Sequence, residues 1–135
     1  LNYNIKFQYE FKNILIEGNE EKIAQVIDNI IDNAFSFAND KGQMEIKLKL
    51  ENNKVLIFFD DDGPGFPTLG ITKVFDRFYS ERPIDEEFGK HSGLGLSISK
   101  QIIEAHNAEI KVENVFDQKK NVIGARVKLI FAKYK

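Results

Sequence analysis

The sequence predicts an α+β fold in which helices cover one face of an antiparallel or mixed sheet. Two stretches, 20–39 and 93–105, carry apolar residues at helical spacing. Three expected strands alternate apolar with charged residues, so one face of the sheet should meet water while helices cover the other. At 135 residues and 42% hydrophobic composition, the chain is long enough for one domain with a core. We therefore expect a single domain over residues 1–135.

The N-terminal part should contain two short strands followed by a long helix. Apolar residues alternate over 4–10 and cluster over 13–17, which is typical of short strands. Asn19 follows a glycine and precedes two glutamates, a pattern that places a helix N-cap at Asn19. The helix should then continue to about residue 39.

The rest of the chain reads as further strands, one long irregular segment and a second helix. The remaining expected strands are 44–50, 55–59, 110–115 and 122–131. Residues 66–92 contain only one short helical candidate, around 71–78, and a connection this long is usually either disordered or a working lid. The second helix, 93–105, begins at a glycine.

Composition excludes several classes of function. The net charge of −2 and the absence of a Lys/Arg cluster give no electrostatic footprint for nucleic acid or for a membrane surface. The chain has no cysteine, so it has neither disulfides nor thiolate chemistry. No apolar run approaches the ~18 residues of a membrane span, and neither a signal peptide nor an initiator Met is present. We expect a soluble piece of a longer protein.

The first helix carries an unusual polar stripe. Asn29, Asn33 and Ser36 are spaced i, i+4 and i+7, so they line up beside the apolar face. Two carboxamides placed in this way can face one ligand, and an amide oxygen suits Mg²⁺ that arrives with the phosphates of a nucleotide. The alternative is that both asparagines are ordinary polar residues at the boundary of the core.

Two glycine-rich stretches complete the pattern. Residues 61–65, Asp-Asp-Gly-Pro-Gly, follow a buried strand, so a carboxylate can be held there while the glycines let the main chain approach a ligand. Residues 93–96, Gly-Leu-Gly-Leu, open a helix and offer unpaired N–H groups to an anion. Each stretch alone could be a structural turn, but chance does not easily explain all three features in this order.

These motifs resemble those of the catalytic ATP-binding domain of bacterial two-component sensor histidine kinases, in the superfamily that also contains DNA gyrase, Hsp90 and MutL. The stretches 29–34, 61–65, 75–79 and 93–96 are similar to the N, G1, F and G2 boxes of that family, and the similarity covers nearly the whole chain. The amino-acid sequences of segments 75–83 and 89–99 resemble most closely those of the ChvG type of envelope-sensing kinase.

The resemblance implies a Bergerat ATP-binding fold, a two-layer α/β sandwich whose mainly antiparallel sheet of about five strands carries three helices on one face. It implies ATP and Mg²⁺, with Asn33 on the metal, Asn29 near the phosphates and metal, and Asp61 on the adenine amino group. Arg77 would clamp phosphate and, with Asn29, act in catalysis. Further nucleotide contacts would come from Gly63, Gly65, Phe66, Tyr79, Lys90, His91, Ser92, Gly93, Leu94, Gly95 and Leu96. Phe75 and Phe78 would anchor the lid, at about 66–92, unless they are simply core residues.

Departures from the family pattern refine the expectation. Ser36 and Ser80 stand where many members carry a basic residue, although Arg82 is near enough to replace the second. Hydrolytic members of the superfamily place a glutamate, the general base, four residues before the metal-binding asparagine, and this chain has Asn29 there. An amide cannot accept that proton, so transfer to another nucleophile is favoured over hydrolysis.

The resemblance therefore implies a histidine kinase that passes the γ-phosphoryl group of ATP to a histidine, feeding a phosphorelay. Neither His91 nor His106 lies in the helical context of a phosphoacceptor, and His106 is expected to be structural. The acceptor should lie on a helical dimerisation domain outside these residues, with a response regulator downstream, in the cytoplasmic part of a membrane-anchored sensor. The alternatives are a protein serine kinase of the anti-sigma-factor type, a nucleotide-binding signalling module without transfer activity, and an ATPase.

Overall fold

The computed structural model describes residues 4–9, 15–37, 42–66, 74–75 and 95–133. Within these residues five strands and two α-helices follow one another along the chain. Their bounds are β1 Asn4–Tyr9, α1 Glu20–Phe37, β2 Gln43–Glu51, β3 Lys54–Asp61, α2 Gly95–Ala105, β4 Glu109–Phe116 and β5 Val122–Ala132.

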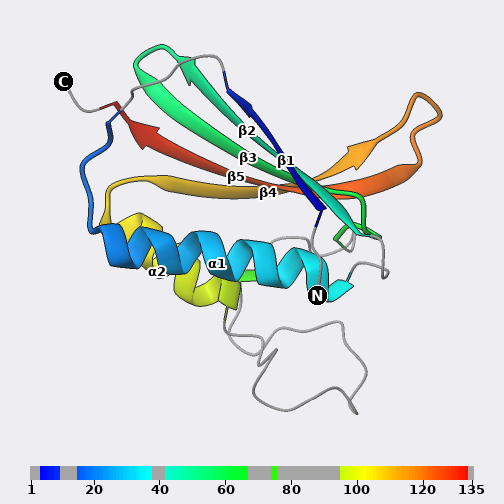
Figure 1. Cartoon of the computed structure of the whole chain (residues 1–135), viewed down its shortest axis with the longest axis horizontal. Coiled ribbons are helices and arrows are strands. Elements are labelled where there is room, and N and C mark those ends of the chain that lie inside the picture. Colours follow the sequence, from blue (N-terminus) through cyan, green and yellow to red (C-terminus); the bar gives the residue numbers. More distant parts are fainter. Residues whose placement is uncertain (1–3, 10–14, 38–41, 67–73, 76–94, 134–135) are drawn as a thin grey trace.

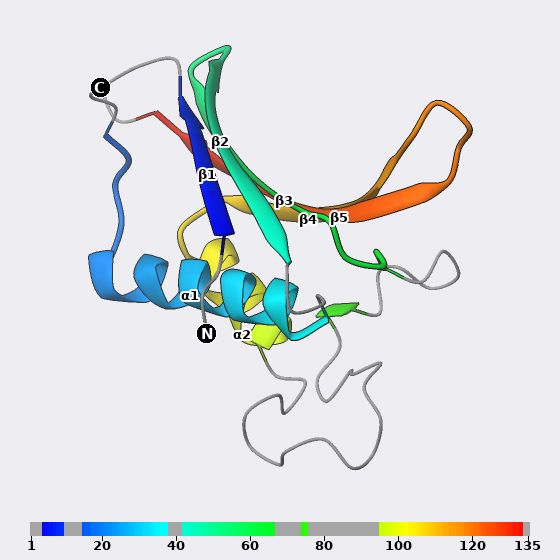
Figure 2. The ribbon, with the colours of Figure 1, turned by 45° about the vertical axis from the view of Figure 1, so that its right-hand side comes forward.

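The strands form one five-stranded sheet in the order β1-β2-β3-β5-β4. β1 pairs with β2 in parallel, and every other pair is antiparallel, which confirms the mixed, mainly antiparallel sheet that the sequence predicts. Both helices lie on the same face of this sheet (Figures 1 and 2). The two-layer arrangement is therefore as expected, with β3 in the middle of the sheet and β5 beside it.

The core lies between the sheet and α1 and α2. Val26, Ile30 and Ala34 recur along one side of α1 and are buried because they meet the apolar residues of the strands. On β3 the buried residues are Val55 and Phe59, so the odd-numbered residues of this strand face the helices. Even-numbered residues of β3 face the helix-free side of the sheet.

Hydrogen bonds connect the N-terminus of α1 to the C-terminal end of α2. Asn19 caps α1 through its side-chain oxygen, which accepts the N–H of Lys22 at 3.1 Å. The N–H of Asn19 donates to Nε2 of His106 at 3.0 Å, and Nδ1 of His106 donates to the carbonyl of Ile102 at 2.7 Å. The two contacts require the tautomer with its proton on Nδ1. The expected structural role of His106 is confirmed, since it connects the end of α2 to the start of α1.

Some element boundaries differ from expectation. The strand expected at 13–17 is wrong for residues 15–17, which pair with no strand and lead directly into Gly18 and α1. β3 does not stop before Asp60 but continues through Asp61. The third helix, expected around 71–78, falls mainly outside the described residues, which include only the short 3₁₀ turn at 74–75. No helix in the described part of the chain is long and apolar enough to cross a membrane.

Candidate nucleotide site

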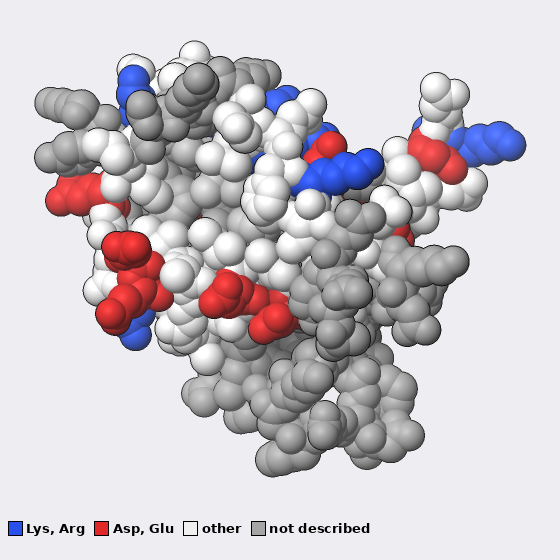
Figure 3. All heavy atoms as spheres, in the orientation of Figure 1, with Lys and Arg blue, Asp and Glu red and all other residues white. Residues whose placement is uncertain are grey.

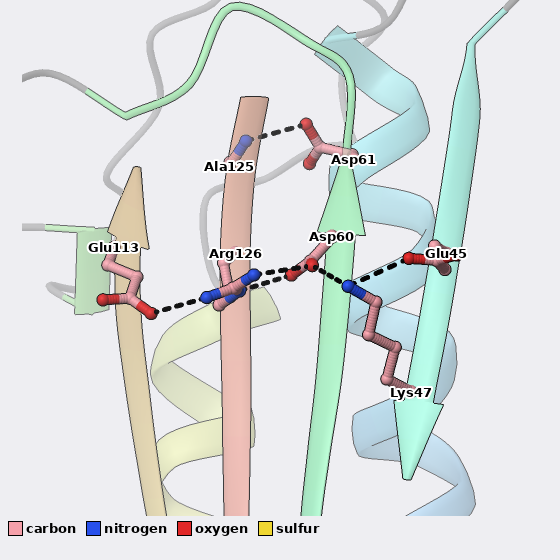
Figure 4. A network of polar contacts seen from close by, with 7 residues as sticks. All are labelled: Glu45, Lys47, Asp60, Asp61, Glu113, Ala125 and Arg126. Carbon is pink, nitrogen blue, oxygen red and sulfur yellow. Dashed lines mark hydrogen bonds and ion pairs between the residues drawn. The ribbon is translucent and has the colours of Figure 1, made fainter. Parts of the chain in front are cut away.

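Three consecutive aspartates, Asp60–Asp62, lie at the end of β3 and just after it, and the structure gives each a different environment. Asp60 faces the helix-free side of the sheet, where the guanidinium of Arg126 grips it with two hydrogen bonds of 2.6 and 2.9 Å (Figure 4). Lys47 lies 3.6 Å from the same carboxylate. Asp62 accepts the N–H of Gln43 at 3.0 Å. Only Asp61 is left on the face covered by the helices.

The carboxylate of Asp61 is anchored through one of its two oxygens. Oδ1 accepts the N–H of Gly63 at 2.8 Å. It also accepts the N–H of Ala125, on β5, at 3.2 Å (Figure 4). No hydrogen bond from a described residue reaches Oδ2. Burial raises the pKa of Asp61 above its ordinary value of 3.8, against the opposing effect of the two main-chain N–H groups. The site therefore holds a partly buried carboxylate with one oxygen fixed and with no described residue bonded to the other.

Two glycines let main-chain segments pack closely at the end of β3 and in the loop that follows it. A Cβ on Gly124 would overlap the carbonyl oxygen of Asp61 and lie 3.0 Å from its carbon, so only glycine allows β3 and β5 to approach so closely here. Gly65 has φ +83°, the left-handed region, and a Cβ there would lie 2.5 Å from Cγ1 of Val122. Packing against β4 and β5 therefore requires glycine at 65, and Gly124 has the same requirement on β5, whereas the approach of the 61–65 main chain to a ligand stays a prediction.

The structure adds a residue that sequence reasoning missed. Asn114, on β4, is only 9% exposed and bonds to both main-chain groups of Phe66. Its one sequence signal is that a polar side chain stands at 114, where the alternation of Ile110 and Val112 on β4 would place an apolar residue.

The predicted metal and phosphate residues of the first helix lie in the second half of α1. Asn29 and Asn33 are half-buried and adjacent in sequence to the buried Ile30 and Ala34. The side chain or main chain of Asn33 also takes part in a polar or ring interaction. The acidic residues exposed on α1 are Glu20, Glu21, Asp28 and Asp32. Acidic side chains are visible along the solvent side of α1 in Figure 3. The two asparagines therefore occupy the boundary between the core and the exposed acids, as their spacing predicts.

In both ribbon views the second half of α1 lies at the same end of the molecule as the loop that follows β3 (Figures 1 and 2). α1 also contacts α2 and β3. Of the glycine-rich stretch 93–96, the structure describes Gly95, the first residue of α2, and Leu96. Leu96 is buried in the core, so only its main chain remains for a ligand. Phe66 and Phe75 are partly buried against the core.

The other predicted site residues lie outside the described residues. They are Arg77, Phe78, Tyr79, Lys90, His91, Ser92, Gly93 and Leu94. Their assignments stay predictions. In the described part of the chain, no three His, Cys, Asp or Glu side chains gather in a way that could hold a metal ion.

Comparison with known proteins identifies the family. A family model described as histidine kinase-, DNA gyrase B-, and HSP90-like ATPase matches residues 18–133. The chain belongs to this family. The resemblance stated from the four motifs is thereby confirmed, and with it the fold class.

Two relatives are a sensor protein and a sensor protein kinase. The chain is 40% identical over 116 residues to the sensor protein ChvG of Agrobacterium fabrum, a match that covers 85% of this chain and 20% of that protein. It is 37% identical over 109 residues to the sensor protein kinase WalK of Staphylococcus aureus, covering 79% of this chain and 26% of the relative. The predicted similarity to the ChvG type is confirmed. The chain spans about a fifth to a quarter of the length of these relatives.

Solved structures share the fold. The catalytic domain of the histidine kinase ThkA, in a nucleotide-free form, superimposes with a TM-score of 0.79 at 24% identity, over 96% of this chain and 78% of that chain. The mycobacterial sensor histidine kinase MprB gives a TM-score of 0.77 at 20% identity, over 97% of this chain and 82% of that chain.

Proposed function

We propose that this chain binds Mg·ATP between Asp61 and the asparagines of α1 and transfers the γ-phosphoryl group to a histidine of a separate helical dimerisation domain. A response regulator would then receive the phosphoryl group. The chain itself would be the cytoplasmic part of a sensor protein that is anchored in the membrane. The observation that carries the proposal is the desolvated, half-satisfied carboxylate of Asp61 beside the Gly63–Gly65 turn.

The geometry of Asp61 suits an adenine base. Because Oδ1 already accepts two main-chain N–H groups, Oδ2 is the oxygen that can accept the exocyclic amino group of adenine. Guanine carries a carbonyl oxygen at the corresponding position, which an ionised carboxylate repels. The site should therefore prefer ATP to GTP.

The residues of α1 fit the phosphate end of the nucleotide. Asn33 offers a single neutral amide oxygen, the kind of donor that Mg²⁺ accepts when waters and phosphates supply its other ligands. The ion would neutralise charge on the phosphates as the γ-phosphoryl group departs. Asn29 can orient phosphate or water by hydrogen bonding, but its amide cannot take a proton. The chain's own contribution is then positioning, which favours transfer to a presented side chain over hydrolysis.

The acceptor histidine should belong to another domain. Both ring nitrogens of His106 are engaged with main-chain groups of Asn19 and Ile102, so this side chain has no free nitrogen to phosphorylate. His91 lies outside the described residues. The engagement of His106 supports a phosphoacceptor on the helical dimerisation domain.

Calorimetric titration with ATP, in the presence and absence of Mg²⁺, tests the binding step. Asp61→Asn should lower ATP affinity by about 10- to 100-fold, because a hydrogen bond to a charged acceptor contributes about 1.5–3 kcal/mol. Asn33→Ala should weaken binding only when Mg²⁺ is present. The matched control is Asp62→Asn, which alters the neighbouring acid and should leave the affinity unchanged. Equal losses in Asp61→Asn and Asp62→Asn would contradict the assignment.

Phosphoryl transfer needs a second assay. The chain is incubated with radiolabelled ATP and a helical domain that contains the acceptor histidine. Label that is lost in acid and retained in base indicates phosphohistidine, whereas acid-stable label on serine would favour the anti-sigma-factor type of kinase. ATP binding without labelling of any acceptor would favour a signalling module without transfer activity.

A further inference from the structure

Asn114 makes an unusual pair of contacts across the site. Its Oδ1 accepts the N–H of Phe66 at 2.6 Å, and its Nδ2 donates to the carbonyl of Phe66 at 2.9 Å. The side-chain amide thus satisfies both main-chain groups of one residue, as a neighbouring strand would. The two residues are 48 positions apart in the sequence, so this contact is purely tertiary.

Phe66 stands at the junction of the Gly63–Gly65 turn and the predicted lid at 66–92. Its side chain is partly buried against the core, while Asn114 holds its main chain. A Cβ on the preceding residue, Gly65, would lie 2.8 Å from Oδ1 of Asn114. The side-chain amide of Asn114 therefore lies beside Gly65 and is hydrogen-bonded to Phe66.

The whole turn is fixed to the β4–β5 pair at both ends. At its start, Asp61 accepts the N–H of Ala125 on β5. At its end, Phe66 is bonded to Asn114 on β4. Glycine-rich main chain is intrinsically free, and ordering it only when a ligand arrives would cost binding free energy. Fixing it beforehand removes that cost.

We propose that Asn114 is a positioning residue for nucleotide binding, which preorganises the turn that seats the adenine base. The inference rests on the proposed function, because it assumes that adenine binds at Asp61 and the turn. A purely structural asparagine would stabilise the fold without setting nucleotide affinity.

Two substitutions separate these roles. Asn114→Ala removes both hydrogen bonds, and Asn114→Asp keeps the shape and the acceptor but turns a second acceptor toward the carbonyl of Phe66. Asn114→Ala should lower the affinity for ATP about tenfold, and Asn114→Asp should lower it further. Adenosine should lose affinity by a similar factor, because the seat of the base is what moves.

The chain offers a matched control in His106. This side chain also bonds main-chain groups of two separate segments, but it does so between Asn19, just before α1, and Ile102, near the C-terminus of α2. His106→Phe should lower the unfolding free energy without changing the affinity for ATP. If His106→Phe and Asn114→Ala lower ATP affinity equally, Asn114 is only structural and the inference is overturned.

Amide hydrogen exchange on the unsubstituted, nucleotide-free chain gives a test that needs no variant. The N–H of Phe66 should exchange slowly before any ligand is added, because Asn114 already accepts it. Fast exchange that slows only on addition of ATP would overturn preorganisation. ATP binding by the parent with an affinity that Asn114→Ala leaves within about twofold would overturn this inference alone. Failure of the parent to bind ATP would overturn the proposed function as well.

Discussion

Gly124→Ala is the substitution for which the geometry predicts the largest effect at the site. The new Cβ would overlap the carbonyl oxygen of Asp61, and the nearby atoms are main chain: the carbonyl carbon of Asp61 at 3.0 Å and Cα of Asp62 at 3.4 Å. Because no flexible side chain can yield, β3 and β5 must separate by about 1 Å. The hydrogen bond from the N–H of Ala125 to Asp61 would be lost with that movement.

The cost can be estimated from these two effects. Overpacking of this kind costs about 1–3 kcal/mol, and loss of a hydrogen bond to a charged carboxylate adds about 1.5–3 kcal/mol, so we expect a loss of about 4 kcal/mol in unfolding free energy. Domains of this size have an unfolding free energy of about 5–15 kcal/mol, so the variant should still fold. Because the movement also misplaces the carboxylate of Asp61, whose hydrogen bond to adenine would contribute about 1.5–3 kcal/mol, ATP affinity should fall by about 10- to 100-fold.

Urea unfolding followed by circular dichroism, together with calorimetric titration of ATP, measures both quantities. Gly18→Ala is the control, because its Cβ would meet only side-chain atoms, Cδ1 of Ile23 at 2.6 Å and Cδ2 of His106 at 2.8 Å. Ile23 can yield, but the His106 ring is held by its two hydrogen bonds, so we expect a loss of about 1–2 kcal/mol in unfolding free energy, less than for Gly124→Ala, and an unchanged ATP affinity. A Gly124→Ala variant that is as stable as Gly18→Ala and binds ATP like the parent would refute the reasoning.

Two further substitutions test the electrostatics of the site and the packing of α2. Burial raises the pKa of Asp61, so the stability that this group contributes is present below the ordinary pKa of 3.8 and is lost as pH rises through the raised value. Asp61→Asn should therefore have a higher melting temperature than the parent at pH 7, and the difference should shrink toward pH 3.8; a lower melting temperature at pH 7 would contradict this sign. Ser99 is 0% exposed, and its Oγ has no partner among the described residues. Ser99→Ala should raise the unfolding free energy by about 1 kcal/mol in urea, whereas a loss would reveal a bonded hydroxyl.

Local patterns were sufficient for most of the fold. The start of α1 follows from Asn19 and the acids behind it, and β2 follows from strict alternation. Residues 15–17 show the limit of such patterns, because an apolar run becomes a strand only when a partner strand is available, and none pairs with it. Strand order is also beyond local patterns. Nothing near β5 indicates that it lies between β3 and β4.

Local patterns also located the candidate site, but they could not predict which of its side chains face the helices. The sequence shows three adjacent aspartates, and the continuous apolar run before them hides which residues of β3 face the helices. Pairing with β2 and β5 resolves this, since Arg126 engages Asp60 on one face while Asp61 is left on the other. Asn114 acts through a contact 48 residues away, and a single sequence offers no signal for that distance.

The position of β5 has a consequence for how the molecule acquires its site during synthesis. β5 is the last strand in the described part of the chain, yet it lies between β3 and β4, and the N–H of its Ala125 donates to Asp61. A growing chain that has not reached residue 122 leaves one edge of β3 unpaired, gives β4 no neighbour and lacks the N–H that orients the carboxylate. The helices can form early from local contacts, but nucleotide recognition must wait for the final strand. The bound nucleotide would therefore report completion of the entire sheet.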